Sequence, residues 1–148
     1  MKYLKVYVLF IVIVAISGCG IGDYEMELPN NYIIWASSAH QVEIVPKESS
    51  YFEEDKIPSK VVEIAWNDRY IIAKQYGLKE KYPNKSDNSY KVPDTSKIYY
   101  WILDTKDKVR YGPYINEKDF NDKKNEISIG HLKLKSLDEL DKLKDYGY

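Results

Sequence analysis

The side chain with the most distinctive chemistry in this sequence is the thiol of Cys19, the only cysteine among 148 residues. Cys19 lies between Gly18 and Gly20, just after the apolar run VYVLFIVIVAI at residues 6–16. A thiol is the side chain here that is nucleophilic enough to accept a diacylglyceryl group as a thioether. We therefore predict that Cys19 is the site of lipidation.

The residues around Cys19 have the pattern of a lipoprotein signal peptide. Lys2 and Lys5 precede the apolar run, which at about 1.5 Å per residue covers roughly half of a ~30 Å hydrocarbon layer. A basic start, a short apolar segment and small residues at its end are typical of a secretory signal peptide. Ile16-Ser17-Gly18-Cys19 resembles the bacterial lipobox, in which a signal peptidase cuts before the cysteine.

Cleavage before Cys19 predicts three parts: a signal peptide at 1–18, a short lipidated tether at 19–23 and one small β-rich domain at 24–148. The domain is large enough to bury its own core. Four residues separate Cys19 from a first strand at Tyr24, and they span at most roughly 14 Å when extended. A domain of this size has a diameter of ~25 Å. We therefore expect it to lie against the outer, extracytoplasmic face of the cell membrane, where its acyl chains hold it.

Charge and composition exclude several classes of function. Loss of Lys2 and Lys5 changes the formal net charge from −1 to −3, which argues against a nucleic-acid partner and against electrostatic attraction to anionic lipid. With Cys19 acylated, no thiol remains for a disulfide, a cysteine zinc site or a cysteine nucleophile.

The other groups that could perform catalysis are scattered along the chain. His40 and His131 are the only histidines, and neither has a second His, Asp or Glu at i+3 or i+4 on a shared helix face. Glu43 lies three residues after His40, but strand geometry points it to the opposite face, so we interpret both histidines as surface residues. Glu25 and Glu27 share one strand face, as a carboxylate pair for acid–base chemistry would, but we interpret them as its solvated side. The sequence has no glycine-rich phosphate loop and no Gly-x-Ser-x-Gly motif. We expect no catalytic residue, no metal and no cofactor.

Aromatic side chains are the remaining resource for binding, because the chain has three tryptophans and fifteen tyrosines. Core packing is the default place for tryptophan. Tyrosines on an open sheet face, in contrast, stack against sugars or peptides. The candidate binding residues are Tyr70, Tyr82, Tyr90 and Tyr100.

These side chains depend on antiparallel strands for their positions. Residues 24–28, 32–36 and 41–45 have strand composition, with a turn at Asn30-Asn31. Residues 61–76 predict a hairpin around Asn67-Asp68 or Asp68-Arg69. The alternation of side chains assigns one apolar face of this hairpin to the core, and we expect Trp66 to be buried there. The core face comprises Val62, Ile64, Trp66, Ile71 and Ala73.

Two further segments complete the predicted sheet. Residues 79–97 predict a nineteen-residue loop, which is either a functional contact or a disordered insertion. A second hairpin follows at residues 98–103 and 109–114, where Asp104 and Asp107 form the turn.

The C-terminal third predicts helices. Asn116 caps a charged surface helix, with Ile115 and Phe120 as a hydrophobic staple. Residues 127–129 add a short strand, and Ser136 caps a final helix that ends near Gly147. The predicted fold class is α+β: mainly an antiparallel β-meander sheet of five to seven strands, with one or two C-terminal helices.

Several short stretches resemble a family of small Gram-positive bacterial lipoproteins classed as a domain of unknown function. They are Ser17-Gly18-Cys19-Gly20, Gly22-Asp23-Tyr24, Ile57-Pro58, Val61-Val62-Glu63-Ile64, Ile71-Ile72-Ala73-Lys74, Tyr99-Tyr100-Trp101-Ile102-Leu103-Asp104, Tyr111-Gly112-Pro113 and Phe120. The resemblance implies an envelope lipoprotein and carries no catalytic or binding residue.

Two functions agree with these observations. One is a non-catalytic binding module at the membrane surface, whose partner is a membrane protein or a lipid-linked envelope component and whose contact is residues 79–97. The other is an accessory or immunity-type lipoprotein that protects a membrane target. An envelope hydrolase is a remote third reading.

Overall fold

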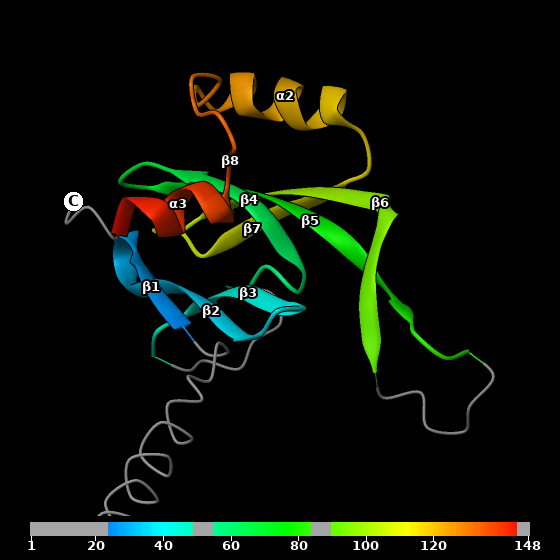
Figure 1. Ribbon diagram of the computed structural model, residues 1–148. Coiled ribbons are helices and arrows are strands. Elements are labelled where there is room, and N and C mark those ends of the chain that lie inside the picture. The colour runs from blue at the N-terminus through cyan, green and yellow to red at the C-terminus, as the bar shows by residue number, and fades with distance from the viewer. Residues whose placement is uncertain (1–23, 49–54, 84–89, 145–148) are drawn as a thin grey trace, which may run out of the picture.

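The computed structural model describes residues 24–48, 55–83 and 90–144. Within these ranges eight strands form two antiparallel sheets, and two short helices lie near the C-terminal end (Figure 1). The predicted α+β class and antiparallel arrangement are confirmed, but the division into two sheets was not predicted. No helix in the described ranges is long and apolar enough to cross a membrane.

The smaller sheet contains the first three strands in sequence order. They are β1 (Tyr24–Leu28), β2 (Tyr32–Ser38) and β3 (Gln41–Pro46). A short 3-10 turn, η1 (Pro29–Asn31), joins β1 to β2. Asn30 and Asn31 have positive φ angles of 57° and 63°, which asparagine tolerates better than most residues. The predicted turn at these two residues is therefore confirmed.

The larger sheet has five strands in the order β7-β6-β5-β4-β8. They are β4 (Val61–Trp66), β5 (Tyr70–Glu80), β6 (Lys91–Asp104), β7 (Val109–Tyr114) and β8 (Lys135–Ser136). Both predicted hairpins are present. In the first, the backbone N–H of Asn67 donates to Tyr70 O at 3.0 Å, so Asp68-Arg69 is the two-residue loop. The Asn67 side chain supports this turn by accepting the N–H groups of Arg69 and Tyr70.

A bulge in β4 changes which valine faces the core. The pairing of β4 with β5 shifts between Val61 and Glu63, and such a shift moves the side chains before it to the opposite face. Val61 is therefore fully buried and Val62 only half-buried, the reverse of the prediction. After the bulge the predicted alternation holds, because Ile64 and Ile71 are both fully buried.

The two sheets pack face to face and enclose the main hydrophobic cluster, which we call the inner core. Trp101 is its buried tryptophan, and its indole N–H donates to Gln75 Oε1 at 2.6 Å. Trp66 is only partly buried against this cluster, because it is the last residue of β4 before the turn. The expectation of a buried Trp66 is corrected to this extent. The buried members are Leu28, Tyr32, Ile34, Ala36, Val42, Ile44, Ile57, Val61, Ile64, Ile71, Ala73, Trp101, Leu103, Leu137 and Leu140.

Helix α2 (Glu117–Glu126) covers the other face of the larger sheet (Figure 1). Its cap is as predicted, since Asn116 Oδ1 accepts the N–H of Asp119 at 2.8 Å. The predicted staple is absent because Ile115 is 76% exposed, whereas Phe120 points to the sheet. The second cluster, which we call the outer core, has four buried members: Ile72, Ile102, Phe120 and Ile129.

The segment after α2 differs from the predicted strand at residues 127–129. Ile127 ends the helix with its N–H on Lys123 O, and Ser128 has a φ of 62°, so the chain turns there. The short strand β8 comes later and leads into α3 (Leu137–Lys144). Ser136 Oγ accepts the N–H of Asp138 at 3.3 Å, as expected of a capping residue. Gly147 lies outside the described residues.

Residues 79–97 form less loop than predicted. β5 and β6 pair as far as Glu80 and Lys91, and residues 84–89 lie outside the described ranges. We call residues 77–83 and 90–97 the arm. It projects from the larger sheet past the smaller sheet, on the side opposite α2 (Figure 1).

The arm leaves the sheet at an irregularity in the pairing of β5 with β6. Tyr76 pairs with Ile98 and Gly77 with Asp94, so three residues of β6 bulge out between these pairs. A Cβ atom on Gly77 would lie 2.8 Å from Lys97 Cβ. The bulged residues of β6 therefore pack so close to β5 that position 77 requires a glycine.

Candidate functional site

The structure divides the four candidate tyrosines between two places. Tyr70 and Tyr100 lie on the outer face of the larger sheet, where they pack against the outer core. Tyr82 and Tyr90 lie on the arm and are 47% and 52% exposed. The four residues therefore form two separate sites.

The outer face is covered, in contrast to the open face expected for Tyr70 and Tyr100. Tyr100 stacks on Phe120 of α2, with ring centroids 5.0 Å apart and planes at 24°. The Arg69 guanidinium carbon lies 5.2 Å from the Tyr70 ring centroid. Neither ring offers a bare face for a sugar, and the space left for a ligand is a pocket beneath α2.

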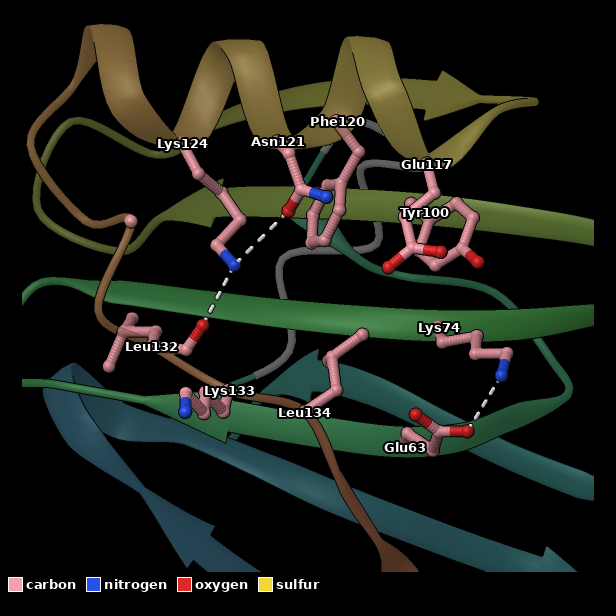
Figure 2. A pocket seen from close by; sticks show the side chains of 11 residues that line it. Glu63, Lys74, Tyr100, Glu117, Phe120, Asn121, Lys124, Leu132, Lys133 and Leu134 are labelled. Carbon is pink, nitrogen blue, oxygen red and sulfur yellow. Dashed lines mark hydrogen bonds and ion pairs between the residues drawn. The ribbon is translucent and has the colours of Figure 1, made fainter.

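This pocket has a volume of about 420 Å³. It lies between α2, the segment at residues 130–134 and the outer face of β4, β5 and β6 (Figure 2). Its apolar wall is made by Phe120, Leu132 and Leu134, and polar side chains complete the lining. A volume of ~300–1,000 Å³ is usual for small-molecule sites, so the pocket suits a small ligand.

Helix α2 places four side chains in the pocket because of their spacing. Glu117, Phe120, Asn121 and Lys124 stand at i, i+3, i+4 and i+7, which brings them to one face of a helix. All four line the pocket. The helix is otherwise highly charged, and Phe120 at 2% exposure is the apolar contact that fixes this face toward the sheet.

Lys124 is the most buried charged group in the pocket, with 7% exposure. Its Nζ donates to Leu132 O at 2.8 Å and to Asn121 Oδ1 at 3.5 Å, and it lies 5.2 Å from the Phe120 ring centroid. It forms no ion pair within the described ranges. Burial lowers the pKa of Lys124, partly offset by the charge of Glu117.

The other end of the pocket holds an ion pair, a tyrosine and a carboxylate. Lys74 Nζ bonds to Glu63 Oε1 at 2.7 Å, and this bond raises the pKa of Lys74. Burial, followed by the charge of Glu117, raises the pKa of Tyr100. Glu117 itself is exposed and has no hydrogen bond or ion pair to another described side chain. The pocket thus presents a buried cation at one end and an available carboxylate at the other (Figure 2).

The arm offers a different arrangement of basic and aromatic groups. Lys81 Nζ lies 5.4 Å from the Tyr82 ring centroid and 5.0 Å from that of Tyr90, distances at which cation–π attraction operates. The described arm contains four lysines and two acidic residues. The arm is therefore locally basic on a chain whose formal net charge is negative.

Asp104 is more than the turn residue predicted from the sequence. Its Oδ1 accepts the N–H groups of Lys106 and Asp107, which confirms the turn role. It is also 2% exposed and binds the Arg69 guanidinium through contacts of 2.6–3.1 Å. The sequence contained the signal: Arg69 is one of two arginines and lies in the neighbouring hairpin turn.

The other expected groups form no catalytic or metal constellation. His131 is exposed, whereas His40 is half-buried in the β2–β3 turn with its ring 6.3 Å from that of Tyr90. Glu25 and Glu27 are exposed, as their assignment to the solvated face predicted. No group of three or more acidic, histidine or cysteine residues that could hold a metal occurs in the described ranges. Cys19 lies outside them.

Comparison with known families found one relation. The family described as Protein of unknown function (DUF3997) matches residues 29–138, which include both sheets except strand β1. Comparison with curated proteins and with solved structures found no match.

Proposed function

We propose that this chain, which belongs to the DUF3997 family of unknown function, is a lipid-anchored binding module that acts at the outer surface of the cell membrane. The lipid attachment rests on Cys19 and on the Ile16-Ser17-Gly18 sequence before it. Two or more acyl chains give stable membrane attachment. The arm is the contact with the partner.

The observation that carries this proposal is the direction of the arm. The arm extends past the smaller sheet (Figure 1), and the smaller sheet begins with β1 at Tyr24. Only four residues separate Tyr24 from Cys19, a reach of at most roughly 14 Å. A domain attached so closely presents the smaller sheet and the arm to the membrane side and α2 to the opposite side.

The chemistry of the arm suits a partner at that surface. Tyrosine and lysine are side chains that proteins place at the boundary of membrane and water, because each combines an apolar body with a polar end. Tyr82 and Tyr90 are both exposed, and the ring of each lies close to Lys81 Nζ. The lysine excess favours an acidic partner, such as an external loop of a membrane protein or the phosphate of a lipid-linked envelope component.

Photocrosslinking in intact producing cells tests this proposal. A photoreactive residue at Tyr90 is expected to form adducts with a membrane protein or a lipid-linked component. The matched control is the same residue at Ile115, which is 76% exposed beside α2 and should give none of these adducts. Adducts with mature wall polymer alone, or equal adducts from both positions, would contradict the proposal.

Lipid attachment is tested separately by intact mass. The mature protein should lack residues 1–18 and carry acyl mass on Cys19, and Cys19→Ala should abolish both changes. An unmodified Met1 or a free Cys19 thiol on the native protein would contradict the proposed lipid attachment to the membrane.

A further inference from the structure

The pocket beneath α2 is independent of the arm and of the lipid anchor. We propose that it binds a short zwitterionic peptide of about three residues. The peptide's carboxylate pairs with Lys124 and its ammonium pairs with Glu117. Its apolar side chains lie against Phe120 and Leu134, which Figure 2 shows between these two ends.

The carboxylate end of the site is defined by Lys124. A lysine ammonium has three N–H donors, and only two acceptors in the described ranges receive them, one of them at 3.5 Å. Both acceptors are neutral, so no carboxylate of the described ranges pairs with this nearly buried cation, and a buried cation without an ion pair costs free energy. A ligand carboxylate supplies the missing charge and acceptor. Lys133, on the same side of the pocket in Figure 2, adds a second positive charge there.

The ammonium end is defined by Glu117. Glu63 is already engaged with Lys74 at 2.7 Å, whereas Glu117 lines the same pocket without a hydrogen bond or ion pair in the described ranges. A carboxylate at a pocket edge attracts a cation in preference to a second anion. The two ends therefore fix the direction of a peptide as well as its charge.

The length of the ligand follows from helix geometry. Glu117 and Lys124 are seven residues apart on α2, which is roughly 10 Å along the helix axis. An extended peptide spans about 3.3–3.6 Å per residue, so three residues match this separation. The volume of about 420 Å³ is at the small end of the usual range for ligand sites, and it excludes a folded partner.

Calorimetric titration of the full chain in detergent tests the proposal, with Ala-Leu-Ala as the probe. The unmodified tripeptide should bind, and N-acetylation or C-amidation should each weaken binding by about tenfold or more. Glu117→Gln should remove the difference between the free and acetylated forms. Lys124→Met should remove the difference between the free and amidated forms.

The controls keep the test independent of folding. Lys118→Met and Glu126→Gln change the same charges on α2 outside the pocket lining and should leave all affinities unchanged. Because the acetylated and amidated peptides need no protein variant, a misfolded Lys124→Met would not remove the test. Equal affinity of the doubly blocked peptide, or no binding of any form at millimolar concentration, would overturn the peptide site and leave the proposed role of the arm unaffected.

Discussion

The two faces of the larger sheet are built from the same strands but have different coverings. β5 sends Ile71 to the inner core and the adjacent Ile72 to the outer core, and β6 sends Trp101 inward and Tyr100 outward. The inner face meets a whole second sheet. The outer face meets one helix and the segment after it, and a pocket lined by six ionisable side chains lies between these elements and the sheet.

This difference indicates a division of roles between the faces. Burial of apolar side chains between two sheets is the dominant source of folding free energy. A buried lysine that forms no ion pair within the described ranges, such as Lys124, reduces stability, and such groups are typical of binding sites. We infer that the inner face holds the domain together and that the outer face is adapted to a ligand.

The largest expected effect comes from the buried tryptophan of the inner face. Trp101→Ala should lower the free energy of unfolding by about 3–5 kcal/mol, since it also leaves Gln75 Oε1 without its indole donor. Trp66→Ala, on the same face but only partly buried, should cost about 1–2 kcal/mol. Urea unfolding measures both. A larger loss for Trp66 would mean that the core is centred on the hairpin turn.

Adjacent isoleucines of β5 compare the two faces directly, because Ile71 and Ile72 are both fully buried. Ile71→Ala should cost about 4 kcal/mol, and Ile72→Ala about 2–3 kcal/mol, because α2 can settle toward the sheet more easily than two sheets can approach each other. The same unfolding assay gives the difference. Equal or reversed losses would remove the argument that the outer face is less tightly packed.

Asp104 is expected to make a smaller contribution to the free energy of unfolding than these core residues. Asp104→Asn keeps the one oxygen that accepts the turn N–H groups but removes the charge opposite Arg69, and should cost about 2 kcal/mol at neutral pH. Burial alone would raise the pKa of Asp104, but the bonds from Arg69 and from the N–H groups of Asp107 and Lys106 outweigh it, so the pKa is lowered.

The lowered pKa sets the direction of a pH effect. The stabilisation by Asp104 is fully present above the pKa of an unfolded aspartate, about 3.9, and is lost as the pH falls through the lower folded value. The free energy of unfolding of the native protein should therefore fall as the pH is lowered through this range. The Asp104→Asn variant should show a smaller fall over the same range. Parallel acid curves for the two proteins would show that the ion pair contributes nothing.

The sequence predicted the strands well because each element carried its own local signal. The Asn67-Asp68-Arg69 turn, the Asn116 cap and the alternation after Ile64 depend on residues within one hairpin or one helical turn. The bulge at Val61 and the helix covering Tyr100 depend on contacts between distant segments, which no local pattern records.

The pocket was missed for the same reason. Lys124 and Leu132 are eight residues apart, and Glu63 and Lys74 belong to a different part of the chain. The spacing of Glu117, Phe120, Asn121 and Lys124 on one helix face was visible in the sequence. It became a pocket wall only because that face packs on the sheet.

The smallest effect on stability is expected on the arm. Tyr82→Ala removes an exposed ring and should change the free energy of unfolding by less than about 0.5 kcal/mol, while it lowers the yield of crosslinks from Tyr90. Thermal unfolding and the crosslinking assay provide the two values. A large loss of stability would identify the arm as part of the fold and not as a contact surface.

The most direct test of the division between the faces is a titration of methyl-labelled leucines followed by NMR, with Ala-Leu-Ala added to the full chain in detergent. Leu132 and Leu134 line the pocket, whereas Leu28 and Leu103 lie in the inner core. We predict that the methyl signals of Leu132 and Leu134 shift with peptide concentration and that those of Leu28 and Leu103 stay fixed. Unchanged signals from Leu132 and Leu134, or equal shifts at all four leucines, would contradict this prediction.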